Sequence, residues 1–457
     1  MDTEKAHGFK AKTWLVTGRK LYHNTTYEKL PTRFQLLSQD RVPELVQSIL
    51  SVDVGQEIPE VSTLLQNDSQ FRLVLERLGQ KFQKINLKAS LDKNCPRSKP
   101  EGPIDTEKVY SFLNAILLNL KSEVSSLVGG GTSPIKDLQK VLTKLLCKSI
   151  SPSTKMTVGE IMSGVKVKSL QEHWIQKYRG AAKVNICAKI RCWIVRHFFW
   201  KILDSFFHCT ESTHKKHQMF FYRKSGWQAM CDTALHSLTS SGRLRPLTSS
   251  YRKKFQAKSD APPTVRIRFI PKRNLTEVRT ITRSEKAKDL DPSLVTLVRN
   301  YSQMFAAKAD LGGKILGQRW ESLVQAVDSK KDLFWITADI TDAFGSILLK
   351  KLTEILKDCR DRSLPVRDVS LRESTEKLIR RLMLRTVSLK WGGKEKMFYV
   401  EKGVLQGDPL SSDLCDIYYG HMVTTILSQF LTPPHGTEEI FLRGVDDFLF
   451  ISTDKSR

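Results

Sequence analysis

The stretch FLRGVDDFLFIS, residues 441–452, decides how the fold of this chain is interpreted. Apolar residues flank the adjacent Asp446 and Asp447, which is the pattern of a tight β-hairpin with two carboxylates at its tip. Taken alone, the pair also fits an ordinary turn, because aspartate is favoured in turns for its own conformational reasons. A second acidic strand end is needed to choose between these interpretations.

Such a strand end lies upstream. The apolar run LFWITA, residues 333–338, is short enough for a buried strand and is followed by Asp339. Three carboxylates that converge from two strands can hold two Mg²⁺ ions, which activate an attacking oxygen and stabilise a leaving phosphate oxygen. A purely structural trio would need counter-ions that the local sequence does not show. We therefore expect a polymerase palm with two Mg²⁺ ions at Asp339, Asp446 and Asp447.

The segment VLQGDPLSS, residues 404–412, lies between the two acidic strands. Gly407 permits a close backbone approach, Pro409 stops a strand or begins a helical turn, and the residues that follow can start a helix. Such a turn can press its backbone against a nucleotide. Gln406 and Gly407 are therefore predicted to bind the nucleotide.

The order of these segments resembles motifs A, B and C of the reverse transcriptases. The resemblance implies that Asp339 and Asp446 are direct metal ligands and that Asp447 is a ligand or a supporting carboxylate. Phe344 stands where the family places a bulky aromatic residue, so it is the candidate gate against a 2′-hydroxyl. Packing in the core is a compatible role for Phe344, and Gly345 departs from the acidic residue often found next in this family.

The composition favours a nucleic-acid partner. The chain has 457 residues, and 74 Lys and Arg against 48 Asp and Glu give a formal net charge of +26. Such an excess attracts polyanions, or an anionic membrane surface. No apolar span or lipid anchor accompanies the charge, so we expect no membrane association. The 8 cysteines form no CxxC pair, as expected for reduced thiols.

The N-terminal half is predicted to be a helical bundle. Apolar residues recur at helical spacing in Pro43–Leu50, Val109–Leu120, Ile135–Leu146 and, most strongly, Ala182–Phe207. The aromatic residues of this last helix are expected to be core.

The next stretch, MFFYRKSGW at residues 219–227, mixes aromatic and cationic side chains. Aromatic faces can stack on unpaired bases while Arg and Lys hold phosphates, although a strand with half-buried aromatics is an alternative. The candidate RNA-binding residues are Phe220, Phe221, Tyr222, Arg223, Lys224 and Trp227. The string FFYRKS with its following Trp resembles the T motif of telomerase reverse transcriptases, and residues 21–31 resemble a weaker CP-type element. This resemblance implies a telomerase RNA-binding domain, with telomerase RNA as its partner.

Two basic strands are predicted at TVRIRFIPK, residues 264–272, and at the residues after Arg279. Lys272 and Arg279 could neutralise an incoming triphosphate, or the hairpin could be simply solvated. The segment resembles motifs 1 and 2 of telomerase fingers, which implies that both residues bind the nucleotide. A further hairpin is expected at 387–400.

The expected fold is multidomain: a mainly α-helical RNA-binding domain followed by α+β reverse-transcriptase fingers and palm, a right-hand polymerase without its thumb. The predicted divisions are an N-terminal tail at 1–20, the RNA-binding domain at 21–235, the fingers at 236–330, and a palm at 331–457 that is incomplete after motif C.

The resemblance implies a nuclear enzyme at telomeres that copies an RNA template onto a telomeric single-stranded DNA primer with deoxynucleoside triphosphates. Two alternatives remain at this point. One is a thumbless, non-catalytic fragment or isoform that binds telomerase RNA. The other is a retroelement reverse transcriptase, which the FFYRKS string disfavours.

Overall fold

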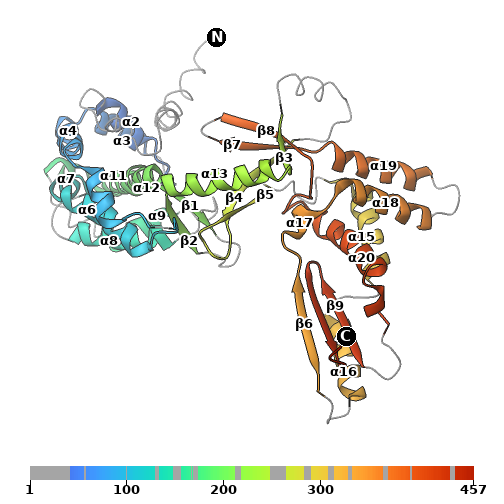
Figure 1. The fold of residues 1–457 in the computed structure, drawn as a ribbon. Helices are drawn as coiled ribbons and strands as arrows, with labels where there is room; N and C mark the ends of the chain where they lie inside the picture. The colour runs from blue at the N-terminus through green and yellow to red at the C-terminus, as the bar shows by residue number, and fades with distance from the viewer. Residues whose placement is uncertain are drawn as a thin grey trace. The chain divides into compact units, whose positions relative to one another are not determined.

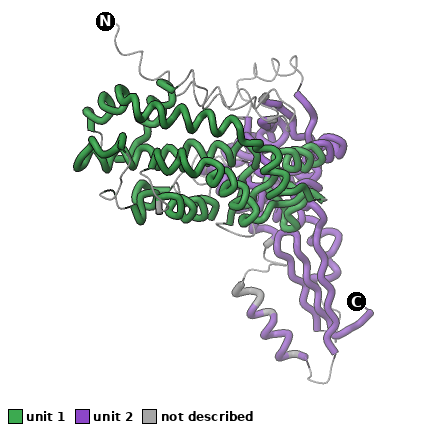
Figure 2. Tube along the Cα trace, turned by 90° about the vertical axis from the view of Figure 1, so that its left-hand side faces the viewer, with its two compact units in different colours: residues 1–234, 270–279 green, residues 235–269, 280–457 purple. Residues whose placement is uncertain are grey.

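The computed structural model of the chain describes residues 42–55, 58–98, 100–128, 133–147, 156–165, 167, 173–211, 218–247, 264–282, 290–306, 313–327, 332–363, 369–391, 394–432 and 438–456. The predicted tail at 1–20 and the CP-type element at 21–31 lie outside these residues. The chain forms two compact units, coloured separately in Figure 2: residues 1–234 with 270–279, and residues 235–269 with 280–457.

The first unit is built mainly of helices. They are α2 (Val42–Leu50), α3 (Pro59–Gln66), α4 (Ser69–Gln83), α5 (Leu87–Asn94), α6 (Thr106–Asn119), α7 (Lys121–Val128), α8 (Ser133–Cys147), α9 (Val158–Met162), α10 (His173–Gln176), α11 (Gly180–Trp193), the π-helical turn η5 (Ile194–Phe199) and α12 (Trp200–Phe206). An antiparallel pair follows, β1 (Phe207–Glu211) and β2 (Met219–Arg223). The helix α13 (Lys224–Ser240) comes next along the chain.

The long helix predicted near Ala182–Phe207 is confirmed as the continuous run of α11, η5 and α12. The isoleucines of its apolar stripe are buried, and so is Lys189, whose side chain the amphipathic pattern places away from that stripe. The Lys189 ammonium donates to the carbonyls of Leu50, at 2.7 Å, and Val52, at 3.0 Å. Because Leu50 is the last residue of α2, the buried cation satisfies a carbonyl that the end of that helix leaves free.

The second unit combines helices with two sheets. Its helices are α15 (Pro292–Ala306), α16 (Gly313–Ala326), α17 (Ala343–Ser346), α18 (Leu349–Ser363), α19 (Val369–Met383), α20 (Ser411–Thr425) and the 3₁₀ turn η7 (Ser428–Phe430). A five-stranded sheet has the order β3-β8-β7-β4-β5, formed by Leu244–Pro246, Lys394–Val400, Thr386–Trp391, Val265–Pro271 and Val278–Thr282. A three-stranded sheet has the order β6-β10-β9, formed by Phe334–Asp339, Asp447–Ser452 and Glu439–Gly444.

The predicted strands are present in the five-stranded sheet. Along β4 the apolar side chains are buried and both arginines, Arg266 and Arg268, are exposed, as the alternating sequence predicts. The predicted hairpin at 387–400 is confirmed by antiparallel β7 and β8. The tip of the β4–β5 hairpin, residues 270–279, belongs to the first compact unit, whereas the rest of β4 and β5 belongs to the second.

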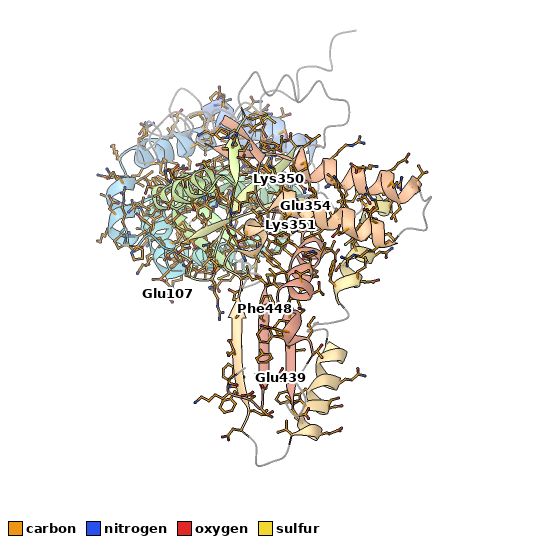
Figure 3. All side chains as sticks on the ribbon, turned by 45° about the vertical axis from the view of Figure 1, so that its right-hand side comes forward. Glu107, Lys350, Lys351, Glu354, Glu439 and Phe448 are labelled. Carbon is orange, nitrogen blue, oxygen red and sulfur yellow. The ribbon has the colours of Figure 1, made fainter. Side chains whose placement is uncertain are left out.

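The three-stranded sheet carries the acidic hairpin, and α16 lies beside it (Figure 1). Both of its faces are partly covered. Leu323 of α16 packs against Ile440, Leu442 and Ile451. On the other side, Val423 of α20 and Phe430 of η7 pack with phenylalanines of β9 and β10. Figure 3 shows Phe448 and Glu439 at opposite ends of this sheet. Phe448 directly follows Asp447 in the sequence.

The prediction that 333–338 is a buried strand is wrong. β6 pairs only with β10 among the described residues, and Trp335 and Ile336 are 68% and 62% exposed. The reason is its position: α16 packs against β9, and α20 and η7 cover β9 and β10, while β6 lies at the sheet edge. An apolar run identifies a strand, but it does not show what covers that strand.

Candidate active site

The two acidic strand ends predicted from the sequence meet in the three-stranded sheet. Asp447 at the start of β10 is paired directly with Asp339 at the end of β6. Asp446 precedes β10, and its carbonyl accepts a 3.1 Å hydrogen bond from the amide of Ile340, the residue after Asp339. The antiparallel register therefore brings all three aspartates to one end of the sheet.

The electrostatics of this end fit a cation site. Burial, with the charges of Asp447 and Asp339, raises the pKa of the Asp446 carboxyl above its ordinary value. Carboxylate oxygens, such as those on these neighbouring strand ends, are ligands that Mg²⁺ binds. In this conformation no three acidic, His or Cys side chains of the described residues are gathered as a ready metal-binding group.

Backbone strain is concentrated around these predicted functional segments. The non-glycine residues with positive φ in the described part of the chain are Leu275 at 61°, Asp342 at 58° and Val445 at 58°. Aspartate tolerates this region, whereas leucine and β-branched valine do so poorly. Leu275 lies between Lys272 and Arg279, Asp342 follows Asp339 closely, and Val445 directly precedes Asp446. Each strained turn is held by neighbouring groups.

The turn at Val445 is held by Arg443, which is 4% exposed. Its guanidinium donates to the Val445 carbonyl at 2.9 Å and to the carboxylate of Asp416 on α20 at 3.0 Å. Gly444 and Asp447 are paired across the hairpin, so Val445 and Asp446 form its two-residue loop. Arg443 thus joins the acidic hairpin to the helix that packs beside it.

The predicted nucleotide-binding loop is fixed to β5 and to the start of α20. The amide of Thr282, at the end of β5, donates to the Gln406 carbonyl at 2.9 Å, and the Ser411 hydroxyl donates to the Leu405 carbonyl at 2.6 Å. Gly407 has φ of +87°, and a Cβ there would lie 3.1 Å from Oγ1 of Thr282. Glycine is therefore favoured by both conformation and space, and its exposed backbone remains open to a ligand.

The next residue of the loop, Asp408, is buried in an ion-pair network. Its carboxylate contacts the guanidinium of Arg385, and Arg381 lies 3.7 Å away. The side chains of Asp408 and Arg385 are 2% and 6% exposed. Asp408 also accepts from the amide of Leu410 at 3.0 Å, next to the first turn of α20. The end of β5, the start of α20 and the segment that carries Arg385 therefore determine together where Gln406 and Gly407 lie.

Phe344, the predicted sugar gate, is half-buried and sits in the short helix α17. Its carbonyl accepts from the amide of Val404 at 2.8 Å, so the segment after β6 is joined to the segment that leads to Gln406. Arg243 forms an ion pair with Asp342 in the same turn. The ring packs against the second unit's main core, so the predicted packing role is confirmed, while its gating role stays a prediction.

The hairpin tip that carries Lys272 is tied to β2 of the first unit. The buried Tyr222 hydroxyl donates to the Leu275 carbonyl at 3.0 Å. The Lys272 amide donates to the Glu277 carbonyl at 2.8 Å, and its ammonium lies 2.6 Å from the Glu277 carboxylate. Lys272 is exposed and Arg279 is half-buried. An incoming phosphate would therefore compete with Glu277 for the Lys272 ammonium.

The predicted aromatic surface for RNA is not a surface in this structure. Phe220, Phe221, Tyr222 and Arg223 are between 1% and 8% exposed, because β2 is buried along its length. Arg223 donates to the Cys95 carbonyl at 3.1 Å and to Asp92 at 2.7 Å. These four side chains are packed in the structure, which fits the alternative of a strand with buried aromatics, and their binding to RNA stays a prediction.

The two remaining candidates from this string are also packed. Trp227 is 9% exposed and stacks on His208, with ring centroids 4.0 Å apart. Burial lowers the pKa of Lys224 from its ordinary value, while the nearby Asp204 and Cys209 favour its charged form. These contacts favour the alternative of a packed strand over an exposed binding platform.

Sequence reasoning missed the residues that hold the site. Arg443, Arg385 and Arg243 bind carboxylates or backbone carbonyls beside the predicted motifs. Arg443 offered a signal, because a cation interrupts the otherwise apolar start of the hairpin two residues before Val445. Arg385 and Arg243 lie far from their partners in sequence and offered none.

The comparisons agree with this arrangement. A family model described as "Telomerase ribonucleoprotein complex - RNA binding domain" matches residues 108–238. The telomerase reverse transcriptase of Mus musculus is 28% identical over 278 residues, which are 54% of this chain and 24% of that protein. That of Rattus norvegicus is 25% identical over 431 residues, 76% of this chain and 37% of that protein. The chain thus spans about a quarter to two fifths of these relatives' length.

Solved structures have a similar fold. The apo telomerase of Candida tropicalis truncated from its C-terminal domain has a TM-score of 0.70 at 18% identity, covering 94% of this chain and 88% of that chain. The Candida albicans telomerase with a TWJ fragment of telomeric RNA has a TM-score of 0.67 at 16% identity, covering 92% of this chain and 71% of that chain. The predicted fold class, a mainly α-helical domain followed by an α+β region, is confirmed by this likeness.

Within the described ranges, no helix has both the length and the apolar character that crossing a bilayer demands.

The matched family, the curated relatives and the solved structures together show that the chain is a telomerase reverse transcriptase-like protein.

Proposed function

We propose that this chain acts in RNA-templated DNA synthesis, extending a telomeric single-stranded DNA primer with deoxynucleoside triphosphates. The observation that carries the proposal is the direct pairing of Asp339 with Asp447, with Asp446 beside them. These three carboxylates are the charged groups that a two-metal nucleotidyl transfer needs at one point. The loop of Gln406 and Gly407 is connected to the same unit's Phe344 turn through the Val404 amide.

Two Mg²⁺ ions, held by Asp339 and Asp446 with Asp447 as a ligand or supporting carboxylate, would activate the primer 3′-hydroxyl and stabilise the leaving pyrophosphate. The other residues act on the nucleotide. Phe344 limits space at the sugar, and the Gln406–Gly407 backbone supports the nucleotide. Lys272 and Arg279 neutralise the triphosphate, and Lys272 exchanges its 2.6 Å contact with Glu277 for a phosphate oxygen.

The partner that supplies the template is proposed to be telomerase RNA. The first unit contains most of residues 108–238, which match the RNA-binding family model, and the similar Candida albicans telomerase was solved with telomeric RNA. The net charge of +26 favours binding to a phosphate backbone. Because the β2 aromatics are buried, we place the RNA contacts on exposed side chains of this unit. Work at chromosome ends implies a nuclear, telomeric location.

Templated extension tests this function. The purified chain is given telomerase RNA, a telomeric primer, Mg²⁺ and deoxynucleoside triphosphates, and the products are sequenced. We expect the added nucleotides to follow the RNA template and to change when a template base is changed. Tight, salt-dependent RNA binding without any addition would instead support a non-catalytic RNA-binding chain. Addition that ignores the template would contradict the proposal.

A further inference from the structure

The hairpin that carries Asp446 contains a residue in an unfavourable conformation. Val445 has φ of 58°, in the left-handed region where a β-branched side chain is rarely found. It occupies the first position of the two-residue loop between Gly444 and Asp447, a position usually filled by Gly, Asn or Asp. Something outside the loop must hold this conformation, because valine does not favour it.

Arg443 supplies that hold from a buried position. It is 4% exposed, and its guanidinium Nη1 donates to both the Val445 carbonyl at 2.9 Å and the Asp416 carboxylate at 3.0 Å. Asp416 lies on α20 and binds the guanidinium. Arg443 therefore connects the turn to this helix. Val445, which directly precedes Asp446, has a strained backbone. Its carbonyl also accepts a charge-assisted hydrogen bond from the buried Arg443 guanidinium.

The same helix faces the acidic end of the sheet. Burial raises the pKa of Cys415, the neighbour of Asp416 on α20, to about 12, and the charges of Asp416 and Asp446 act in the same direction while Arg443 opposes them. The side of α20 that holds Arg443 is close to the hairpin turn.

We propose that Arg443, fixed by Asp416, is a positioning residue that sets the metal-binding geometry of Asp446 and Asp447. The proposal rests on the function proposed above, in which these carboxylates hold Mg²⁺. Arg443 acts through the Val445 carbonyl: it keeps the loop in its left-handed conformation, which in turn fixes where Asp446 leaves the hairpin and keeps Asp447 in register with Asp339. Without it, the turn relaxes and Asp446 and Asp447 lose the backbone position from which they reach a shared ion.

The first measurement is hydrogen exchange of the 441–448 segment in the full chain, which needs no metal. Arg443→Met removes both hydrogen bonds while keeping an unbranched apolar stem. We expect faster exchange in this segment and intermediate exchange in Arg443→Lys, which can still donate one bond. Unchanged exchange in Arg443→Met would overturn the proposal, because the turn would then hold itself.

The second measurement is Mn²⁺ binding followed by electron paramagnetic resonance. Supporting contacts behind metal ligands alter affinity by about 10- to 100-fold, so Arg443→Met should weaken binding about tenfold, with most of the affinity restored in Arg443→Lys. Faster exchange combined with wild-type Mn²⁺ affinity would also overturn the proposal. Wild-type binding that is unaffected by Asp446→Asn would instead contradict the two-metal function itself, which separates the two failures.

Two further variants separate positioning from stability. Val445→Gly relieves the strain, so Arg443→Met should weaken Mn²⁺ binding much less in the Val445→Gly background than in wild type. Equal effects in both backgrounds would contradict action through Val445. Lys189→Met removes another buried cation bound to backbone carbonyls, in the helical unit. It should lower the melting temperature without changing Mn²⁺ affinity, whereas a matching loss of affinity would show that Arg443 acts only through global stability.

Discussion

Asp447 and Asp339 lie directly opposite each other in the antiparallel pairing of β10 with β6. Like charges placed opposite each other in a sheet disfavour the fold by about 0.2–1 kcal/mol, so this pair weakens the metal-free protein. Asp447→Asn is therefore expected to raise the melting temperature slightly without Mg²⁺, and the gain should shrink when Mg²⁺ is added. Calorimetry with and without Mg²⁺ measures both.

The matched control is Asp332→Asn, an exposed carboxylate two residues before the other end of β6. It should leave the melting temperature unchanged with or without Mg²⁺. A stabilisation by Asp447→Asn that persists in saturating Mg²⁺ would contradict the assignment of Asp447 to the metal site.

Phe344 is predicted to control the choice of sugar. Phe344→Ala removes the ring from α17 but keeps the carbonyl that accepts from Val404. Opening a pocket that excludes a hydroxyl costs discrimination of about 10- to 100-fold, so ribonucleotide use should rise by that factor relative to deoxyribonucleotide use. Single-nucleotide addition with each substrate gives the ratio. Leu348→Ala, which truncates an exposed side chain nearby in sequence, should leave it unchanged.

Variants of the buried pair Asp408 and Arg385 are predicted to change the free energy of unfolding and the KM for nucleotide independently. Arg385→Met leaves Asp408 buried without this partner and should lower the free energy of unfolding by about 3–5 kcal/mol. Adding Asp408→Leu should recover much of that stability, because an apolar pair replaces a buried ion pair. The KM for nucleotide should stay raised, since the contact between Arg385 and Asp408 no longer holds the loop of Gln406 and Gly407 in place.

Urea unfolding and nucleotide titration test this pair. Recovery of both stability and KM in the double variant would show that Asp408 contributes nothing beyond folding. Recovery of neither would show that the hydrogen bond from the Leu410 amide, which Asp408→Leu also removes, matters more than the ion pair.

Tyr222 links β2 to the hairpin tip that carries Lys272. Tyr222→Phe keeps the buried ring and removes only the hydrogen bond to the Leu275 carbonyl. A single such bond contributes about 0.5–1.5 kcal/mol, so the KM for nucleotide should rise about two- to tenfold. RNA affinity should stay unchanged, because the ring is covered.

Tyr178→Phe is the matched control, because it removes another buried tyrosine hydroxyl, which donates to Asp68 at 2.9 Å in the helical unit. It should lower stability without raising the KM. A Tyr222→Phe variant with normal KM and weakened RNA binding would return Tyr222 to the RNA-contact role that the sequence suggested.

Much of the arrangement could be predicted from the sequence, because it follows from local patterns. Alternating burial defines β4, helical spacing defines the α11 to α12 run, and aspartates at apolar strand ends identify the acidic hairpin. The pairing of Asp339 with Asp447 follows once both strands lie in one antiparallel sheet, since the register then brings their acidic ends together.

What could not be predicted depends on contacts between distant segments. The burial of Phe221 and Tyr222 depends on the helices and the hairpin tip packed around β2, which a cation-aromatic string does not encode. The exposure of Trp335 depends on which strands the helices cover. The positive φ of Val445 contradicts local preference, and the contacts that hold it, including the hydrogen bond from the Arg443 guanidinium, come from outside the two-residue loop.

The most direct test of the account is single-nucleotide addition to a telomeric primer on telomerase RNA, comparing the wild-type chain with Asp446→Asn in saturating Mg²⁺. The substitution keeps the size of the side chain and removes one carboxylate from the acidic end of the sheet. We predict equal RNA binding and a loss of addition of at least about 100-fold, as expected when a charge that organises the transition state is removed. Addition by Asp446→Asn at a rate close to that of the wild type would contradict the assignment of this hairpin as the catalytic centre.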